Sequence, residues 1–194
     1  MQATPEKVKT EFDKYKKRGD YHWREFNSKT IYRQHVLHVL DWITEDNVLD
    51  IGAGDGLITH QLRLRGKDAV GIDNSPHGLA IAKQKGVPVS AGDAYDLPKD
   101  RIFDAVFLGD VIEHLKHPED CIEQVKHVLA PNGSLYIVTP PQAHDGVILD
   151  PHHYREYTPG ELVEFMQALG FDLVSQEVRR EWHRMYLRFR RADG

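Results

Sequence analysis

The stretch VLDIGAGDG, residues 48–56, is a short apolar run that ends in three glycines separated by single residues. A strand that runs straight into a glycine-rich turn is typical of α/β sheets, where ligands sit beyond the carboxyl ends of the strands. Glycines let the backbone turn sharply and approach a ligand closely at the N-terminus of the following helix. The stretch therefore predicts the first strand of such a sheet and a ligand beside it.

Beyond this stretch, short β-branched runs alternate with helical patterns. The predicted strands are residues 47–52, 68–73, 87–91, 103–109, 134–139, 171–177 and 185–190, and the predicted helices are 57–65, 76–84, 118–129 and 158–170. Alternating strands and helices indicate a parallel sheet, and the hairpin formed by the last two strands indicates an antiparallel strand at its edge. The predicted fold is α/β: a Rossmann-like, doubly wound, mostly parallel seven-stranded sheet with an antiparallel edge strand and N-terminal helices.

The first 45 residues are expected to be helical. Asn27 or Ser28 could cap the second helix of this segment, and the helix that starts at Pro118 should stop at residues 131–133. Because the sequence contains no repeat or linker, we expect one domain over residues 1–194. Its helical arm, residues 1–45, should cover the ligand site.

Composition limits the function classes. Hydrophobic residues at 40% and charged residues at 28% exclude a disordered chain. No apolar run approaches the ~18 residues of a membrane helix, the charged start does not resemble a secretory signal, and one cysteine cannot form an internal disulfide. We therefore expect a cytoplasmic protein with no membrane span.

Charge is unevenly distributed around a net −5. Residues 1–33 and 178–194 each carry +4, which leaves −13 for the middle of the chain. An acidic middle disfavours nucleic-acid phosphates and suits a cationic ligand. The basic ends are either solvated faces or a small anion-binding patch.

The glycine loop has features that narrow the ligand. Its GxGxG spacing differs from the GxGxxG of dinucleotide-binding proteins, and Asp50 and Asp55 place carboxylates beside it. Asp73 ends the second strand, 21 residues after Gly52, where a carboxylate can accept both hydroxyls of a ribose. A ribose, a positively charged tail and no diphosphate describe S-adenosylmethionine.

At this point the chain resembles the class I S-adenosylmethionine-dependent methyltransferases. The resemblance covers residues 47–177 through VLDIGAGDG, GIDNSP, GDAYDLP, FDAVFLGDVIEHL and LAPNGSLYIVTPP. Two segments, DVIEHL and REYTPGELVEFMQALGF, resemble the branch that contains ubiquinone-pathway O-methyltransferases and many sugar and natural-product methyltransferases. The resemblance implies an enzyme that methylates, at oxygen, a small molecule of the quinone-precursor, sugar or natural-product type.

The resemblance also implies roles for individual residues. Gly52 and Gly54 would pass under the methionine end of the cofactor, Asp73 would hold the ribose, and Asp93 with the Ala94 amide would contact the adenine. The Gly109 carbonyl would accept from the ammonium, and Arg33 would bind the carboxylate unless it is a solvent-facing arginine. Asp50, Asn74 and Asp110 complete the predicted cofactor-binding set.

Methyl transfer to a hydroxyl gains from a general base, for which histidine is suited. His114 follows the fourth predicted strand and is the predicted base; packing beside Glu113 is its other interpretation. His152 and His153 are the next candidates. Tyr21, His22 and Trp23 could form a lid or a hydrophobic staple.

Two alternatives stay open. The first is a cofactor-binding protein without catalysis. The second is an RNA 2′-O-methyltransferase, because Asp110, Glu113, His114 and either His152 or His153 resemble its Mg²⁺ or Mn²⁺ site. Asp110 stands where that pattern has glutamate, and the acidic middle disfavours RNA. We therefore expect a small-molecule substrate, no specific nucleic-acid binding, and activity that survives EDTA.

Overall fold

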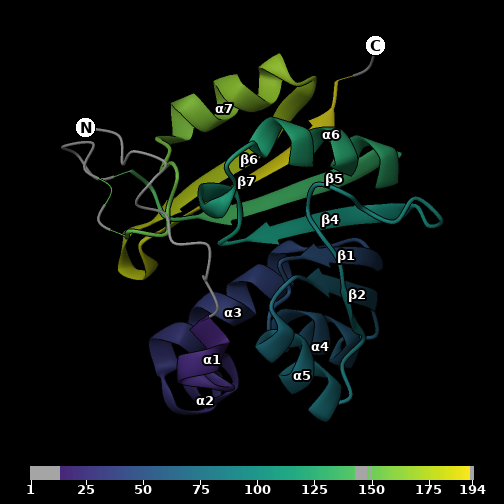
Figure 1. Cartoon of the computed structure of the whole chain (residues 1–194). Coiled ribbons are helices and arrows are strands. Elements are labelled where there is room, and N and C mark those ends of the chain that lie inside the picture. Colours follow the sequence, from purple (N-terminus) through teal and green to yellow (C-terminus); the bar gives the residue numbers. More distant parts are fainter. Residues whose placement is uncertain (1–13, 143–147, 149, 193–194) are drawn as a thin grey trace.

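The computed structural model describes residues 14–142, 148 and 150–192. Within these residues seven strands form one sheet in the order β3-β2-β1-β4-β5-β7-β6 (Figure 1). The strands are β1 (Asn47–Ile51), β2 (Asp68–Asp73), β3 (Val89–Ala91), β4 (Phe103–Gly109), β5 (Leu129–Thr139), β6 (Phe171–Arg179) and β7 (Arg184–Arg191). The predicted seven-stranded α/β fold is confirmed.

Helices cover both faces of the sheet. They are α1 (Lys14–Arg18), α2 (Tyr21–Ser28), α3 (Thr30–Trp42), α4 (Leu57–Leu64), α5 (Pro76–Gln84), α6 (Pro118–Val128) and α7 (Pro159–Ala168), with short 3-10 turns η2 (Ile112–His114) and η3 (Arg180–Trp182). In Figure 1, α6 and α7 lie on one face and α3 and α4 on the other. No helix among the described residues is long and apolar enough to cross a membrane.

Strand alternation divides the hydrophobic core into two layers. Leu49 and Ile51 of β1 pack into the cluster that contains α6 and α7, whereas Val48 packs into the cluster that contains α3 and α4. Successive strand residues point to opposite faces, so one short strand supplies both layers. This burial fits the place of β1 inside the sheet, between β2 and β4.

The sheet has its switch point between β1 and β4. On one side of β1 the chain continues to β2 and then β3, each paired in parallel with the strand before it. On the other side β1 pairs in parallel with β4. A crevice forms where the chain order reverses, beyond the carboxyl ends of these strands. The glycine loop follows β1 and Asp110 follows β4, so both flank this crevice.

The antiparallel strand is β7. It pairs antiparallel with β5 on one side and with β6 on the other, so both pairings near this edge of the sheet are antiparallel. Arg184, the first residue of β7, therefore lies one strand away from the end of β5 and two away from β4. This placement brings the C-terminal hairpin to the crevice.

Two local predictions were wrong. The N-cap of α3 is Lys29 without a side-chain cap, and Asn27 and Ser28 lie in the last turn of α2. The stop signal at residues 131–133 lies inside β5, because Leu129 already has extended backbone angles and pairs with Phe103. The predicted capping box at Thr158 is present, with its hydroxyl accepting from the Glu161 amide.

Candidate active site

The glycine loop after β1 needs glycine for two distinct reasons. Gly52 and Gly54 have φ angles of 72° and 56°, a region that side chains disfavour. A Cβ on Gly52 would lie 2.4 Å from Cγ2 of Val111, and a Cβ on Gly54 would lie 1.7 Å from Oη of Tyr15. The loop is therefore packed against the chain after β4 on one side and against α1 on the other.

Asp73 fastens this loop to the end of β2. One carboxylate oxygen accepts from the Gly54 amide at 2.7 Å and the other accepts from the Ser75 amide at 2.7 Å. The predicted ribose-binding residue thus stands beside the loop that it orders.

Asp50 is almost fully buried, although it contributes to the wall of the cavity described below. Its carboxyl accepts from the Thr59 hydroxyl at 2.7 Å, and burial raises its pKa to about 7. Thr59, on α4, was not among the predicted residues. The contact ties the first strand to the helix that follows the glycine loop.

One large cavity brings most of the predicted cofactor residues together. It has a volume of about 1450 Å³. Besides Asp50, Gly52 and Asp73, its walls include Asn74, Asp93, Ala94, Gly109 and Asp110. Gly54 lies beneath Tyr15 at its edge. Pockets for one ligand have volumes of roughly 300–1000 Å³, so this cavity has room for a cofactor and an acceptor.

Arg33 is the predicted residue that the structure does not bring to the others. Its guanidinium donates to the backbone carbonyls of Phe26 and Asn27, each at 2.8 Å, and its side chain is exposed on α3. It therefore satisfies the last carbonyls of α2. Of the two interpretations of Arg33, the structure therefore agrees with the solvent-facing arginine and not with the cofactor-binding residue.

The N-terminal helices cover the glycine loop from outside. Nδ1 of His22 lies 3.1 Å from Oδ1 of buried Asp55, and the Trp23 indole donates to the Asp55 carbonyl at 3.0 Å. Tyr15, which the sequence did not single out, packs directly on Gly54. Residues 1–13 of the predicted arm lie outside the described residues.

Asp110 turns the chain out of β4. Its backbone has a φ of 53°, and its amide donates to the Val138 carbonyl at 2.8 Å. Its carboxylate forms an ion pair with Arg184, with Oδ1 2.7 Å from Nε and Oδ2 3.0 Å from Nη2. Although burial raises the pKa of Asp110, the Arg184 guanidinium, together with His35 and Lys14, holds that pKa below its usual value.

Glu113 is buried two residues beyond Val111. It accepts from the Thr139 hydroxyl at 2.8 Å, and its backbone carbonyl accepts from the Tyr154 amide at 2.8 Å. Burial, reinforced by the Asp110 charge, raises the pKa of its carboxyl to about 8. Glu113 is therefore mostly protonated at neutral pH.

His114 faces the same cavity in its neutral form. Burial lowers its pKa to about 4. Its Nδ1 lies 3.0 Å from the His152 carbonyl, which can only accept a hydrogen bond, so the proton of the neutral ring sits on Nδ1. The basic lone pair is therefore on Nε2.

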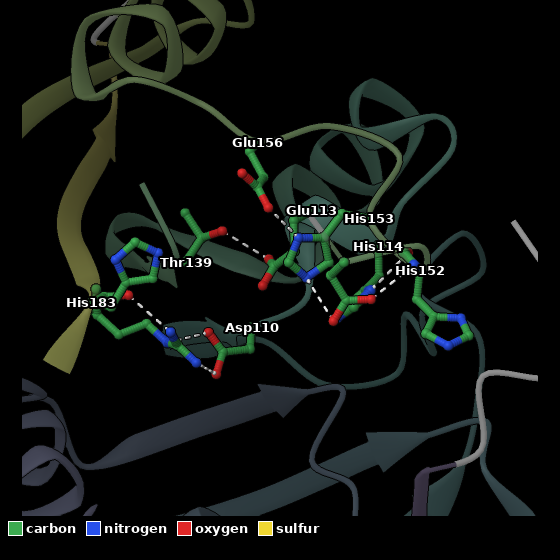
Figure 2. A network of polar contacts seen from close by, with 10 residues as sticks. Asp110, Glu113, His114, Thr139, His152, His153, Glu156 and His183 are labelled. Carbon is green, nitrogen blue, oxygen red and sulfur yellow. Dashed lines mark hydrogen bonds and ion pairs between the residues drawn. The ribbon is translucent and has the colours of Figure 1, made fainter. Parts of the chain in front are cut away.

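Three of the predicted metal ligands meet in space. Figure 2 shows Glu113, His114 and His153 side by side, and one ligand atom from each lies within 4.8 Å of the others. His153 is held through its Nδ1 by Glu156 at 2.7 Å, as the imidazole ligands of metals usually are. One carboxylate and two imidazoles would fit a divalent transition metal better than Mg²⁺.

Asp110 does not join this group. Its carboxylate is committed to Arg184, so the first position of the predicted metal pattern is occupied by an ion pair. Of the two downstream histidines left open by the sequence, His153 and not His152 belongs to the cluster.

Comparisons with known proteins agree with this geometry. Residues 49–137 match the family model described as a methyltransferase domain. An uncharacterized methyltransferase of Staphylococcus carnosus is 28% identical over 162 residues, covering 82% of this chain and 73% of that protein. The ubiquinone biosynthesis O-methyltransferase of Azoarcus sp. is 25% identical over 165 residues, covering 70% of this chain and 71% of that protein.

The fold recurs in solved structures. The magnesium protoporphyrin IX methyltransferase of Synechocystis PCC 6803 with bound S-adenosylhomocysteine superimposes with a TM-score of 0.70 at 17% identity. The alignment covers 92% of this chain and 96% of that one. The matched domain, the methyltransferase relatives and the fold identify the chain as a class I S-adenosylmethionine-dependent methyltransferase. S-adenosylmethionine is accordingly its cofactor.

Proposed function

We propose that this methyltransferase transfers its methyl group to an oxygen of a small molecule, and that His114 is the general base. The observation that carries the proposal is a neutral imidazole, with its basic nitrogen at Nε2, in a cavity large enough for cofactor and acceptor together. The similarity to a ubiquinone biosynthesis O-methyltransferase supports oxygen as the acceptor atom. Quinone precursors, sugars and natural products are the candidate substrates.

The cofactor half of the cavity would hold S-adenosylmethionine through side chains on the ends of β2 and β3 and backbone groups of the loops. Asp73 would accept from the ribose hydroxyls, and Asp93 with the Ala94 amide would bind the adenine. The glycine loop would lie under the methionine end. When bound, the cofactor supplies a methyl group on a sulfonium, which is already a strong electrophile.

His114 would remove the proton of the acceptor hydroxyl at Nε2 while Nδ1–H stays bonded to the His152 carbonyl. This bond fixes the ring orientation, so the base keeps one tautomer. Acid–base assistance of this kind typically contributes about 10²–10⁴-fold. The arm helices α1 and α2 would exclude water from the reacting atoms. We further propose that residues 1–194 form a single methyltransferase domain.

Transfer of isotopically labelled methyl from S-adenosylmethionine into a metabolite extract tests the function. We expect label in small molecules as an O-methyl group, and unchanged transfer in EDTA. S-adenosylhomocysteine binding without transfer to any acceptor would favour a non-catalytic cofactor-binding protein. Transfer to RNA that EDTA abolishes and Mn²⁺ restores would instead assign Glu113, His114 and His153 to a metal.

A further inference from the structure

Two strained backbone positions flank one ion pair. Among the described residues, Asp110 and His183 are the non-glycine residues with positive φ, at 53° and 50°. Asp110 holds the Arg184 guanidinium, and His183 directly precedes Arg184 in the chain. Such strain persists where the surrounding structure enforces it, and it clusters at ligand sites.

Arg184 reaches the cavity from the C-terminal hairpin. Its Nε lies 2.7 Å from Oδ1 of Asp110, its Nη2 donates to Oδ2 of Asp110 at 3.0 Å, and its Nη1 donates to the His183 carbonyl at 2.8 Å. A guanidinium has five N–H groups. The hydrogen bonds of Nη1 and Nη2 use two of them and leave one further N–H on each Nη nitrogen, while the side chain keeps 27% of its surface exposed.

The Asp110 carboxylate fixes the guanidinium plane. The ion pair at Nε and the hydrogen bond from Nη2 hold the guanidinium against one carboxylate, which orients it toward a second planar partner. Arg184 lines the cavity together with Trp182 and His183. A preoriented cation at a cavity wall costs little rotamer entropy when it binds an anion.

Charged groups of both signs stand near Arg184. Lys14 and Glu181 also line the cavity, and the charge of Lys14 acts on both Asp110 and His114. The neighbouring acid Asp110 is paired with Arg184, whereas Glu113 accepts from the Thr139 hydroxyl. The remaining N–H groups of the two Nη nitrogens form a planar fork, which is the geometry that recognises a carboxylate bidentately.

We propose that Arg184 is a specificity-determining residue that binds a carboxylate of the methyl acceptor. The inference rests on the proposed function, since it names the substrate class: small hydroxyl compounds that carry a carboxylate. The Arg184 fork would hold the carboxylate and thereby direct the acceptor hydroxyl toward His114.

Binding of two probes of equal shape tests the proposal. Calorimetry with saturating S-adenosylhomocysteine compares 3-hydroxybenzoate with 3-hydroxybenzamide, which differ in the carboxylate alone. Charge-assisted hydrogen bonds predict that the wild-type protein binds the benzoate at least about tenfold more tightly. Arg184→Gln should reduce this preference to less than about twofold.

Two further variants keep the result interpretable. Arg190→Gln, an exposed arginine on the same strand, should keep the wild-type preference. Because Arg184→Gln leaves the Asp110 charge unmatched, the double variant Asp110→Asn/Arg184→Gln removes both charges and should lose the preference too. An unchanged melting temperature shows that each variant is folded.

Equal binding of the two probes by the wild-type protein, including no binding of either, would overturn the carboxylate assignment. A preference that survives Arg184→Gln would overturn the role of Arg184. Neither outcome touches the proposed function, which fails separately if labelled methyl reaches no oxygen acceptor.

Discussion

The two halves of the cavity are built in different ways. The cofactor half is local: Asp73 binds the Gly54 amide 19 positions away and the Ser75 amide two positions away. The acceptor half is assembled from distant segments: Asp110 and Arg184 are 74 positions apart, and His114 and the His152 carbonyl are 38 apart. Backbone amides shape the first half, and side chains shape the second.

Burial perturbs ionisation in both halves. In the cofactor half Asp93 is exposed, whereas burial raises the pKa of Asp50, which is bound to Thr59, to about 7. In the acceptor half burial shifts the pKa of Glu113 upward to about 8 and that of His114 downward to about 4. Strongly shifted groups in a cleft are candidates for acid–base chemistry, which supports the proposed role of His114.

The largest expected effect separates the two halves directly. His114→Asn should lower turnover about 10³-fold, because it removes the proposed base, while calorimetry should find the affinity for S-adenosylhomocysteine unchanged. His127→Asn, an exposed histidine on α6, is the matched control and should be silent. A loss of S-adenosylhomocysteine affinity without a loss of turnover would place His114 in the cofactor half and contradict its role as the base.

The converse variant acts on the cofactor half. Asp73→Ala should weaken S-adenosylhomocysteine binding by about 100-fold, since charge-assisted hydrogen bonds to the ligand and to the loop amides contribute about 1.5–3 kcal/mol each. Calorimetry measures this, and Asp104→Ala, at an exposed position on β4, should bind normally. Normal affinity of Asp73→Ala would remove Asp73 from the ribose.

The contact between the halves is smaller but measurable. Gly52→Ala should lower the free energy of unfolding by about 2 kcal/mol. An alanine is strained at the positive φ of this position, and its Cβ would collide with the side chain of Val111. Denaturant unfolding of Gly52→Ala, Val111→Ala and the double variant forms a cycle. We expect the double variant to cost about 1 kcal/mol less than the sum; strict additivity would mean that the halves do not touch there.

The smallest expected effect is a pH dependence from Glu113. Its folded pKa of about 8 lies above the usual value of 4.5, so the folded state binds more protons than the unfolded state between these values. Stability therefore falls as pH rises through this window. Above pH 7 the histidines are largely neutral. There the free energy of unfolding should fall by about 1 kcal/mol per pH unit.

Glu113→Gln should flatten that slope in denaturant unfolding at pH 7 and pH 8. Glu164→Gln, which changes an exposed carboxyl on α7, should leave the slope as it is. An equal slope in Glu113→Gln and the wild-type protein would show that Glu113 is ionised at neutral pH in the folded state.

Sequence patterns predicted many of the residues of the cofactor half, because these residues belong to short motifs along the chain. Two glycines, an apolar strand and an acid at the end of the next strand are visible as one motif, and the structure brings Asp73 to that loop. Arg33 lay at the family spacing, yet its guanidinium binds the carbonyls of α2. Spacing along a helix does not say which way a long side chain turns.

The order of the functional residues along the chain is visible in the sequence: the glycine loop and His114 each follow a predicted strand, and Asp73 ends one. The folded structure was needed to show that Tyr15 packs on Gly54, that His153 joins Glu113 and His114, and that Arg184 pairs with Asp110. The last of these contacts depends on the sheet order, which inserts β7 between β5 and β6. Sheet order arises from packing of the whole core, so no local pattern encodes it.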